Sequence, residues 1–453
     1  MYLLQWLEML KRHRGFITIL LLGILLRIIL ILWSTTFREH PDILRWKDWG
    51  QIAFLHGFAD TYTPTHLSFG TYPNNMPPMT LYIVSTMYWC WLQMGKVLNL
   101  FGIAPGSNPW VNTVLLTIFL RIPSFVCDVG IGIFIYAGVL AVIKRQRNAI
   151  VAASLFLFNP AVLYNSAIWG QMDSINNFFF LVGIWCLTVR KHIASSMAYA
   201  LSLLTKFSLL TMAPVFIWLT WLQSKKSAKI VAFSIGVIVV TTLLAVVPIS
   251  HTPWEWYMRY AQANATGEMT NVTAFAFNFW WVIFHPTLQL GIITDAFDVT
   301  NISLNNSPLV ETMYGMVSLK VVSIAVSFAS MVYIYWSWWK CNIGKKHTIQ
   351  SIYILIASIA IISYLFLPQM HERYLYPAWA PLAILIGLGV PVMWELVGLS
   401  LLNLINVFIV WHPMPLPIWM YEIMQHAFFQ WGTAILTVVL GIYTTKKMLS
   451  NIK

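Results

Sequence analysis

Charged side chains are scarce in this sequence, at 9% of its 453 residues, and only 15 of them are Asp or Glu. Hydrophobic residues make up 59% of the chain, and its mean hydropathy is +0.71. An ordinary soluble domain is excluded, because its water-exposed surface would need many more charged side chains. The composition instead predicts an all-α polytopic membrane protein.

Cysteine is also rare, and internal repeats are missing. The four cysteines lie far apart in the sequence, without the paired spacing of a disulfide scaffold or a thiolate metal site. Many transporters carry two similar halves, and no such repeat is found in this sequence. A transporter is therefore the weaker interpretation, and nothing in the sequence calls for a metal or another cofactor.

Basic residues outnumber acidic ones, 27 to 15, which gives a formal net charge of +12. Most of the Lys and Arg form short clusters between apolar runs, the pattern that sets the orientation of membrane helices. We interpret the positive charge as a topology signal and expect no nucleic-acid partner. The basic residues before the apolar run 16–33 predict an uncleaved first span with a cytoplasmic N-terminus.

The apolar runs predict about 12 transmembrane helices, with a range of 11 to 13, because about 20 apolar residues cross a bilayer of about 30 Å. Two assumptions place all basic clusters inside: 77–101 lies in the interface, and 194–222 turns back near Thr205 and Lys206. The predicted spans are 16–33, 112–143, 148–166, 174–190, 194–206, 207–222, 229–250, 317–339, 349–367, 377–394, 396–411 and 427–446.

This topology leaves two long external loops, 34–110 and 251–316. We therefore expect an N-terminal membrane module, 1–250, with an external catalytic loop, then the external loop 251–316 and a C-terminal membrane module, 317–453. The protein would lie in the cell membrane with its active site outside, or in the endoplasmic reticulum with a lumenal site if the host is a eukaryote.

The first external loop begins with an unusual concentration of charge between Phe37 and Gly50. If this stretch is helical, Asp42, Arg45 and Trp49 share one face. Asp42 is a candidate general base, whereas a solvated loop beside the membrane is the simpler alternative. The ionisable residues of the stretch are Arg38, Glu39, His40, Asp42, Arg45, Lys47 and Asp48.

A second polar cluster, Trp169 to Asn177, lies between two apolar runs. Gln171 and Asp173 suit the hydroxyl groups of a sugar, and Trp169 offers an aromatic face for a pyranose ring. Capping of the next helix is the alternative for Asp173, but it leaves Gln171 unexplained.

Several cations lie at predicted external positions and could hold a phosphate. Lys206 stands alone at the break of 194–222, where a lipid phosphate could serve as its counter-ion, and simple snorkelling is the alternative. Arg121 lies seven residues before Asp128 in a predicted span, where a structural ion pair is equally reasonable. His371 and Arg373 flank Glu372 after a proline turn.

Taken in order, these motifs resemble the GT-C superfamily of membrane glycosyltransferases, which use polyprenyl-phosphate sugars. The similarity is greatest to the dolichyl-phosphate-glucose glucosyltransferases of N-glycosylation and to prokaryotic proteins similar to the GPI second mannosyltransferase. Asn74, Asn75 and Met76 depart from the acidic residue that often precedes the family's double proline. The matching residues are Asp42, Lys47, Trp49, Pro77, Pro78, Arg121, Asp128, Gly170, Gln171, Asp173, His371, Glu372 and Arg373.

The resemblance implies a GT-C fold and an inverting transfer of mannose or glucose to a lipid-linked glycan or cell-envelope acceptor, without an essential metal or cofactor. Asp42 would be the general base. A transporter or flippase of lipid-linked sugars and a noncatalytic glycan-assembly subunit are the alternatives. The residues expected to bind the donor phosphate are Lys206, His371, Arg373 and Arg121, and those expected to bind sugar or acceptor are Trp49, Trp169, Gln171, Asp173 and Glu372.

Overall fold

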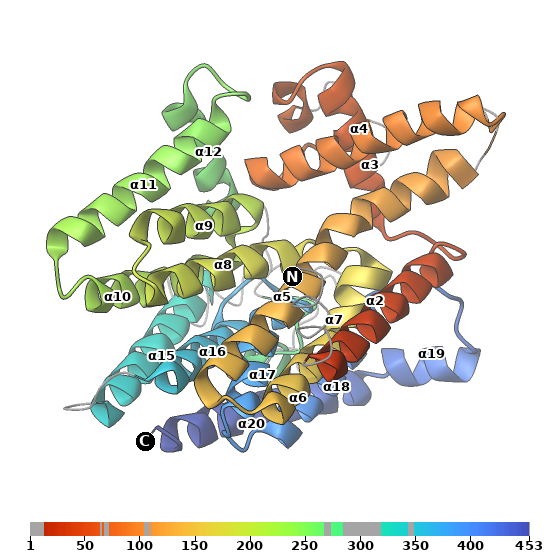
Figure 1. Cartoon of the computed structure of the whole chain (residues 1–453). Coiled ribbons are helices and arrows are strands. Elements are labelled where there is room, and N and C mark those ends of the chain that lie inside the picture. Colours follow the sequence, from red (N-terminus) through yellow and green to blue (C-terminus); the bar gives the residue numbers. More distant parts are fainter. Residues whose placement is uncertain are drawn as a thin grey trace, which may run out of the picture. The chain divides into compact units, whose positions relative to one another are not determined.

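The computed structural model is almost entirely helical (Figure 1). It describes residues 13–63, 66–67, 72–103, 108, 110–266, 273–283, 319–342 and 348–452, without the side chains of 265–266 and 319–321. Most of the predicted external loop 251–316 therefore lies outside the described residues.

Six described helices are long and apolar enough to cross a membrane, and a bent pair of helices makes up to seven. The bent pair, Gln146–Leu157 and Pro160–Trp169, changes direction by 45°. These helices make the chain an all-α, multi-pass membrane protein. The six are α2 (Arg14–Ser34), Trp110–Ile143, α11 (Ala228–Val246), α16 (Ile349–Phe366), α18 (Met393–Val410) and α20 (Ala427–Ser450).

The other predicted spans are helical as well, but they are not among the six. Phe207–Gln223 and Tyr376–Gly387, for example, fall below the length that crosses a bilayer alone. The 12-span count and the GT-C arrangement therefore stay predictions. The segment predicted to lie in the interface forms one helix, α4 (Pro78–Leu100), which is not among the six.

The chain forms two compact units that alternate along the sequence. Unit 1 comprises Met1–Leu20, Gly132–Val162 and Gly267–Lys453, and unit 2 comprises Leu21–Ile131 and Leu163–Thr266. This grouping differs from the consecutive modules 1–250, 251–316 and 317–453, which stay a prediction.

Unit 2 contains the segment 34–110, predicted to be the first external loop, and the polar turn at 169–177. The helix α3 packs on α4, while α9 lies between α8 and α11 in a layered stack (Figure 1). A π-helical turn, Trp110–Leu115, precedes α5, and a second one, Tyr164–Trp169, precedes the polar turn. Its further helices are α3 (Pro41–Leu55), α5 (Leu116–Ile143, which continues into unit 1), α8 (Asp173–Thr188), α9 (His192–Thr205), α10 (Ala213–Gln223) and α12 (Pro253–Thr266), and the 3-10 helices are Ala59–Tyr62 and Phe207–Met212.

The predicted break near Thr205 is present in the structure. The helix α9 ends there, and Lys206 is extended, with φ −161° and ψ 135°. The chain then turns back on α9, because the rings of Tyr199 and Phe216 stack with centroids 4.4 Å apart. A helix that ends and returns in this way places the Lys206 side chain at a turn inside unit 2.

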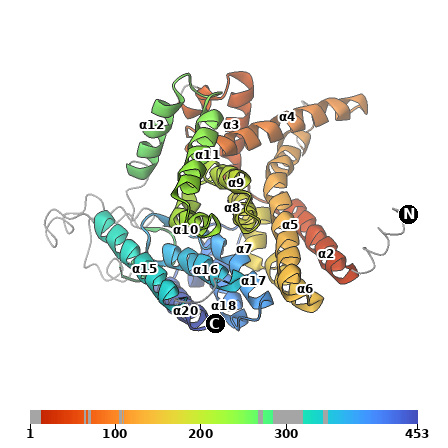
Figure 2. The same cartoon turned by 60° about the vertical axis from the view of Figure 1, so that its left-hand side comes forward.

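Unit 1 is organised around α16, which is buried from Ser351 to Leu365. Figure 2 shows α15 beside α16, and α17 and α20 also pack against α16. A parallel pair of two-residue strands, β1 (Thr273–Ala274) and β2 (Met370–His371), places Ala274 opposite His371. The remaining helices are α6 (Gln146–Leu157), α7 (Pro160–Leu163, at the unit boundary), the 3-10 helix Tyr376–Ala378, α15 (Leu319–Cys341), α17 (Trp379–Gly387) and α19 (Ile418–Gln425).

Candidate functional site

The helix α3 begins immediately before Asp42, and the local sequence explains why. Pro41 occupies the first helical turn, where its missing N–H costs no hydrogen bond. His40 is the N-cap residue, and its Nδ1 accepts a hydrogen bond from the backbone N–H of Asp42 at 3.0 Å. Asp42 therefore lies at the N-terminus of a helix, where the helix dipole favours a negative charge.

The carboxylate of Asp42 is held by two side chains, Arg45 and Gln171. Arg45, one helical turn later, donates to its Oδ1 at 3.1 Å, as the spacing of three residues predicted. The amide of Gln171 donates to Oδ2, and His40 Nδ1 lies 3.4 Å from the same oxygen. The Asp42 side chain is nevertheless 16% exposed, so the orientation of the carboxylate is defined while solvent still reaches it.

The buried side of α3 forms a core cluster with α4. Ile43, Trp46 and Trp49 are at most 2% exposed and pack among apolar side chains of this cluster. Trp49 donates its indole N–H to the backbone carbonyl of Tyr72 at 2.8 Å. Trp49 thus holds the loop before α4 in place, and its buried ring offers no face to a sugar.

The loop that Trp49 holds brings an aromatic ring to the candidate base. The Tyr72 side chain is 61% exposed, and its ring centroid lies 4.9 Å from the guanidinium carbon of Arg45. A cation over an aromatic face is stabilised by the ring quadrupole. Arg45 is therefore fixed between Asp42 and Tyr72.

Gln171 reaches Asp42 because of the turn that precedes it. Gly170 has φ +90°, and the backbone N–H groups of Gly170 and Gln171 both donate to the carbonyl of Asn165, at 3.0 and 2.9 Å. The carbonyl of Gln171 accepts from Ser124 Oγ at 2.6 Å. These bonds fix a buried amide, 1% exposed, toward the Asp42 carboxylate.

Trp169 lies beside the same site without exposing its ring. It is 2% exposed, and its ring centroid lies 4.3 Å from that of His40. Trp169 and Gln171 therefore lie on the buried side of Asp42. Trp169 packs against His40, and Gln171 orients the carboxylate. Their predicted contacts with a sugar would require these buried groups to become exposed.

Gly170 should be intolerant of any side chain. A Cβ at Gly170 would lie 2.8 Å from Ile43 Cδ1 and 3.1 Å from Arg121 Cγ, at a φ that disfavours L-residues. We expect Gly170→Ala to lower the free energy of unfolding by about 2 to 4 kcal/mol, from backbone strain and overpacking together. Equilibrium unfolding in mixed micelles measures this loss.

Gly389 provides the matched control, because it has φ +91° but open space where a Cβ would stand. Gly389→Ala should lose only the backbone contribution, about 1 to 2 kcal/mol. Equal losses in the two variants would contradict a packed role for Gly170.

Lys206 and Asp173 form a buried ion pair. Lys206 Nζ donates to Asp173 Oδ1 at 2.5 Å, and the two side chains are 6% and 2% exposed. Asp173 also accepts from Asn165 Nδ2 at 3.2 Å. The counter-ion that Lys206 requires is therefore supplied within unit 2, and the pair links the break after α9 to the first turn of α8.

Arg121 is also buried, at 1% exposure. Its guanidinium donates to Ser34 Oγ at 2.5 Å and to the carbonyl of Ile31 at 3.5 Å, so it ties the end of α2 to α5. This position inside the helical packing leaves no direct route to a phosphate. Donor binding by Lys206 and Arg121 stays a sequence-based prediction that would require both groups to exchange partners.

Lys47, the basic residue of the Asp42 motif, contacts a different acid. Its Nζ lies 2.7 Å from both oxygens of Glu39, which also accepts from Thr117. Burial lowers the pKa of Lys47, although Glu39 acts in the opposite direction. The pair joins the end of the first span to α3 and positions the helix that carries Asp42.

Asp128 has the structural role that the sequence left open. It accepts from Arg27 Nε at 3.2 Å, from Ser166 Oγ at 2.5 Å and from Ser174 Oγ at 2.7 Å. Both Arg27 and Asp128 are completely buried. Ion pairs inside membrane helices are expected to satisfy one another in this way, and this pair connects α2, α5 and the polar turn.

The late histidine motif lies in unit 1. Arg373 donates to Glu372 Oε1 at 2.5 Å, and His371 Nδ1 lies 3.7 Å from Oε2. Asn403 of α18 donates to the backbone carbonyl of Glu372 at 2.6 Å. Glu372 is 1% exposed, so it serves as the internal counter-ion of its neighbours. The side chain of His371 is 18% exposed, and its predicted contact with a phosphate stays untested.

The charge pair at Glu372 should make unit 1 sensitive to acid. Burial alone would raise the pKa of Glu372, but the charge of Arg373 and the contacts of His371 bring it down to about 2. Because the pKa is lowered in the folded state, the Glu372 charge stabilises the fold at pH values above 4.5, the ordinary pKa of a glutamate. This contribution disappears as the pH falls from 4.5 toward 2. At pH 5 we expect the free energy of unfolding of wild type to exceed that of Glu372→Gln by up to about 3 kcal/mol.

Unfolding of the two proteins at several pH values between 5 and 2 tests this expectation. The difference between them should shrink steadily toward the acid end. A difference that stays constant over this range would show that the Glu372 charge does not stabilise the fold.

The structure brings Asp42, Gln171 and Trp169 together in unit 2, with the Lys206–Asp173 pair in the same unit, while His371, Glu372 and Arg373 belong to unit 1. His40 and Arg45 were not predicted to belong to the site. A histidine before a proline at a helix start could have identified His40 as a cap. The three-residue spacing had already placed Arg45 on the face of Asp42.

A comparison with models of known protein families finds no match, and neither does a comparison with curated proteins.

Proposed function

We propose that this protein is a membrane glycosyltransferase. It transfers a hexose, mannose or glucose, from a polyprenyl-phosphate donor to a lipid-linked glycan or cell-envelope acceptor on the extracytoplasmic face, with inversion. The proposal rests on the order of the motifs and on the surroundings of Asp42. It needs no cofactor, because the phosphate of the donor already leaves as an anion.

The observation that carries the proposal is the oriented, solvent-accessible carboxylate of Asp42. Its oxygens accept from Gln171 and Arg45, which come from segments far apart in the chain, and its side chain remains 16% exposed. The buried carboxylates Asp128 and Asp173, by contrast, are at most 2% exposed and are engaged in ion pairs. A fixed, accessible carboxylate is what a general base requires.

In the proposed reaction, Asp42 takes the proton of an acceptor hydroxyl while the oxygen of that hydroxyl attacks the anomeric carbon of the donor sugar. The bond between that carbon and the phosphate oxygen breaks, and polyprenyl phosphate leaves with the electron pair. Arg45, 33% exposed and 3.1 Å from Asp42, is a cation in a position to stabilise developing negative charge nearby. The configuration at the anomeric carbon is inverted because a single displacement takes place.

An apolar surface near the site suits a substrate with a lipid chain. The helix α4 packs on α3, yet it exposes Trp89, Val97 and Leu100 by 50%, 47% and 83%. Such a face supports the prediction that α4 lies in the membrane interface, at the depth of a polyprenyl phosphate group.

Mass spectrometry of surface glycolipids and polymers from a strain that lacks this protein tests the proposal in cells. We expect one hexose to be missing from one glycan, and its return when the wild-type protein is supplied. Complementation by Asp42→Asn would favour the flippase alternative, because transport has no need of a proton acceptor. An unchanged glycan profile would contradict the proposed function.

A further inference from the structure

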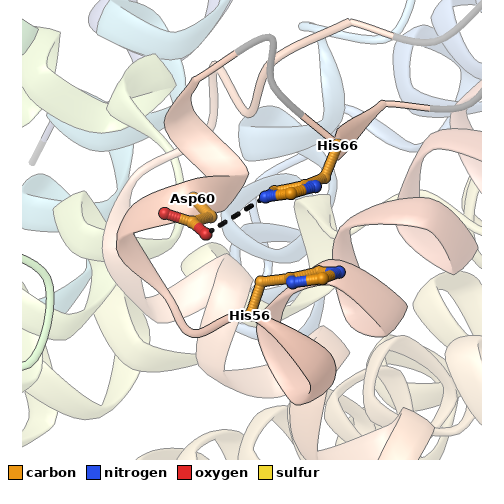
Figure 3. A group of neighbouring side chains, drawn as sticks. All are labelled: His56, Asp60 and His66. Atoms are coloured by element: carbon orange, nitrogen blue, oxygen red, sulfur yellow. Dashed lines mark ion pairs between the residues drawn. The ribbon is translucent and has the colours of Figure 1, made fainter.

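Two histidines and an aspartate meet at the end of α3, apart from the residues that surround Asp42. His56 is the C-cap residue of α3, Asp60 lies in the 3-10 helix that follows, and His66 comes shortly after it (Figure 3). Each residue offers one ligand atom, and the three atoms all lie within 4.8 Å of one another. Within the described part of the chain, this is the one group of His, Cys, Asp or Glu side chains close enough together to hold a metal ion.

The arrangement of the three side chains is specific. The imidazole rings of His56 and His66 are parallel within 3°, with centroids 3.9 Å apart. His66 Nε2 lies 3.6 Å from Asp60 Oδ2, and Figure 3 shows this carboxylate facing the edge of the His66 ring. The side chains of His66 and Asp60 are 41% and 38% exposed, so an ion from solvent can reach them.

The backbone brings these residues together by a tight turn. Gly57 has φ +101°, a conformation that reverses the chain directly after His56. Thr63 then donates to the carbonyl of Asp60 through its backbone N–H at 3.2 Å and its hydroxyl at 3.0 Å. The turn that carries His56 and Asp60 is thus built by its own hydrogen bonds.

We propose that His56, Asp60 and His66 bind a divalent transition-metal ion of the zinc type. Two imidazoles and a carboxylate are ligands that zinc prefers, and water would complete a tetrahedral set. Ligand atoms of such a centre lie about 3.4 Å apart, because each is about 2.1 Å from the metal. The two stacked rings would have to rotate out of their parallel arrangement so that one nitrogen of each points at the ion, and the exposure of both histidines leaves room for this rotation.

The ion would stabilise the external loop that borders the candidate site. The backbone carbonyl of Thr61 accepts from the backbone N–H of Asn74 at 2.7 Å, and the Tyr62 hydroxyl donates to the carbonyl of Met76 at 3.1 Å. The 3-10 helix that carries Asp60 thus contacts the segment just after Tyr72, the residue that packs on Arg45. A metal at its start fixes the loop, and this role does not depend on the proposed transferase activity.

Zinc binding by the full-length, tag-free protein in nanodiscs tests the proposal, after treatment with a chelator and titration with Zn²⁺. We expect one high-affinity ion per chain. His56→Ala, His66→Ala and Asp60→Asn should each weaken binding by at least about 10-fold. His251→Ala is the matched control, since His251 is an exposed histidine of the same unit, and it should bind zinc as wild type does.

Hydrogen exchange gives a second readout. Zinc should slow exchange at the amides of Thr61 and Thr63 in wild type and in His251→Ala, but not in His56→Ala. The proposal is overturned if wild type binds no zinc, or if removing both His56 and His66 leaves the affinity unchanged.

Discussion

Asp42→Asn should lower the rate of sugar transfer by about 10²- to 10⁴-fold, the usual contribution of a general base. The amide retains the size of the carboxylate, and its single oxygen can still accept from Gln171, while its NH2 group faces Arg45 and that hydrogen bond is lost. The amide cannot accept the proton of the acceptor hydroxyl. We therefore expect a loss in kcat with little change in the KM for donor, measured with purified protein and a polyprenyl-phosphate hexose.

Glu255→Gln is the control for removing a carboxylate that takes part in an ion pair. Glu255 lies 3.8 Å from Arg259 on α12 of the same unit, and its side chain is 62% exposed. The activity of Glu255→Gln should stay within about twofold of wild type, because exposed ion pairs contribute little to the stability of a fold. If Asp42→Asn retained comparable activity while folded, Asp42 would not be the base.

The second large effect is expected at the buried pair of Lys206 and Asp173. Lys206→Met leaves the Asp173 carboxylate without its charge partner, and Asp173→Asn leaves the ammonium without one. Each change should lower the free energy of unfolding by about 3 to 5 kcal/mol, because the remaining charge is buried and uncompensated. Unfolding in mixed micelles at neutral pH measures the loss.

The double variant Lys206→Met/Asp173→Asn separates an ion pair from two independent contributions. It should be clearly more stable than the sum of the single losses predicts, since neither charge remains. Arg259→Met is the control, because Arg259 pairs with Glu255 at 3.8 Å while both side chains are mostly exposed, at 83% and 62%, and its loss should be much smaller. Additive losses at Lys206 and Asp173 would show that the pair is not coupled.

Much of the helical architecture could be predicted from the sequence. Apolar runs mark helices because the membrane forces the backbone to satisfy its own hydrogen bonds. The helix break at Thr205 was predicted from charge placement alone, and the structure has α9 ending there. The 45° bend after Leu157 was not predicted, although Pro160 could have indicated it, and Asn159 Oδ1 caps the next helix by accepting from the N–H groups of Ala161 and Val162.

The partners of the polar residues could not be predicted in the same way. Gln171 lies 129 positions from Asp42, and Arg27 lies 101 positions from Asp128, so no local spacing joins them. Lys206 was expected to need a counter-ion, but its partner is 33 residues away, across the helices α8 and α9 and the turn between them. Burial decides between binding and structural roles, and it depends on tertiary packing.

The histidine pair illustrates a related limit. His56 and His66 are ten positions apart in sequence, without a recognised metal-ligand spacing. Their rings nevertheless stack face to face after the chain reverses at Gly57, with φ +101°. This proximity depends on the tertiary fold and not on the residue order.

The most direct test of the account is release of polyprenyl phosphate by the purified protein. The protein in nanodiscs would be given a polyprenyl-phosphate hexose and a membrane lipid extract as the source of acceptor. The account predicts stoichiometric release of polyprenyl phosphate and a glycolipid heavier by one hexose, both lost in Asp42→Asn. Intact donor after prolonged incubation with folded wild-type protein, for both mannose and glucose donors, would contradict it.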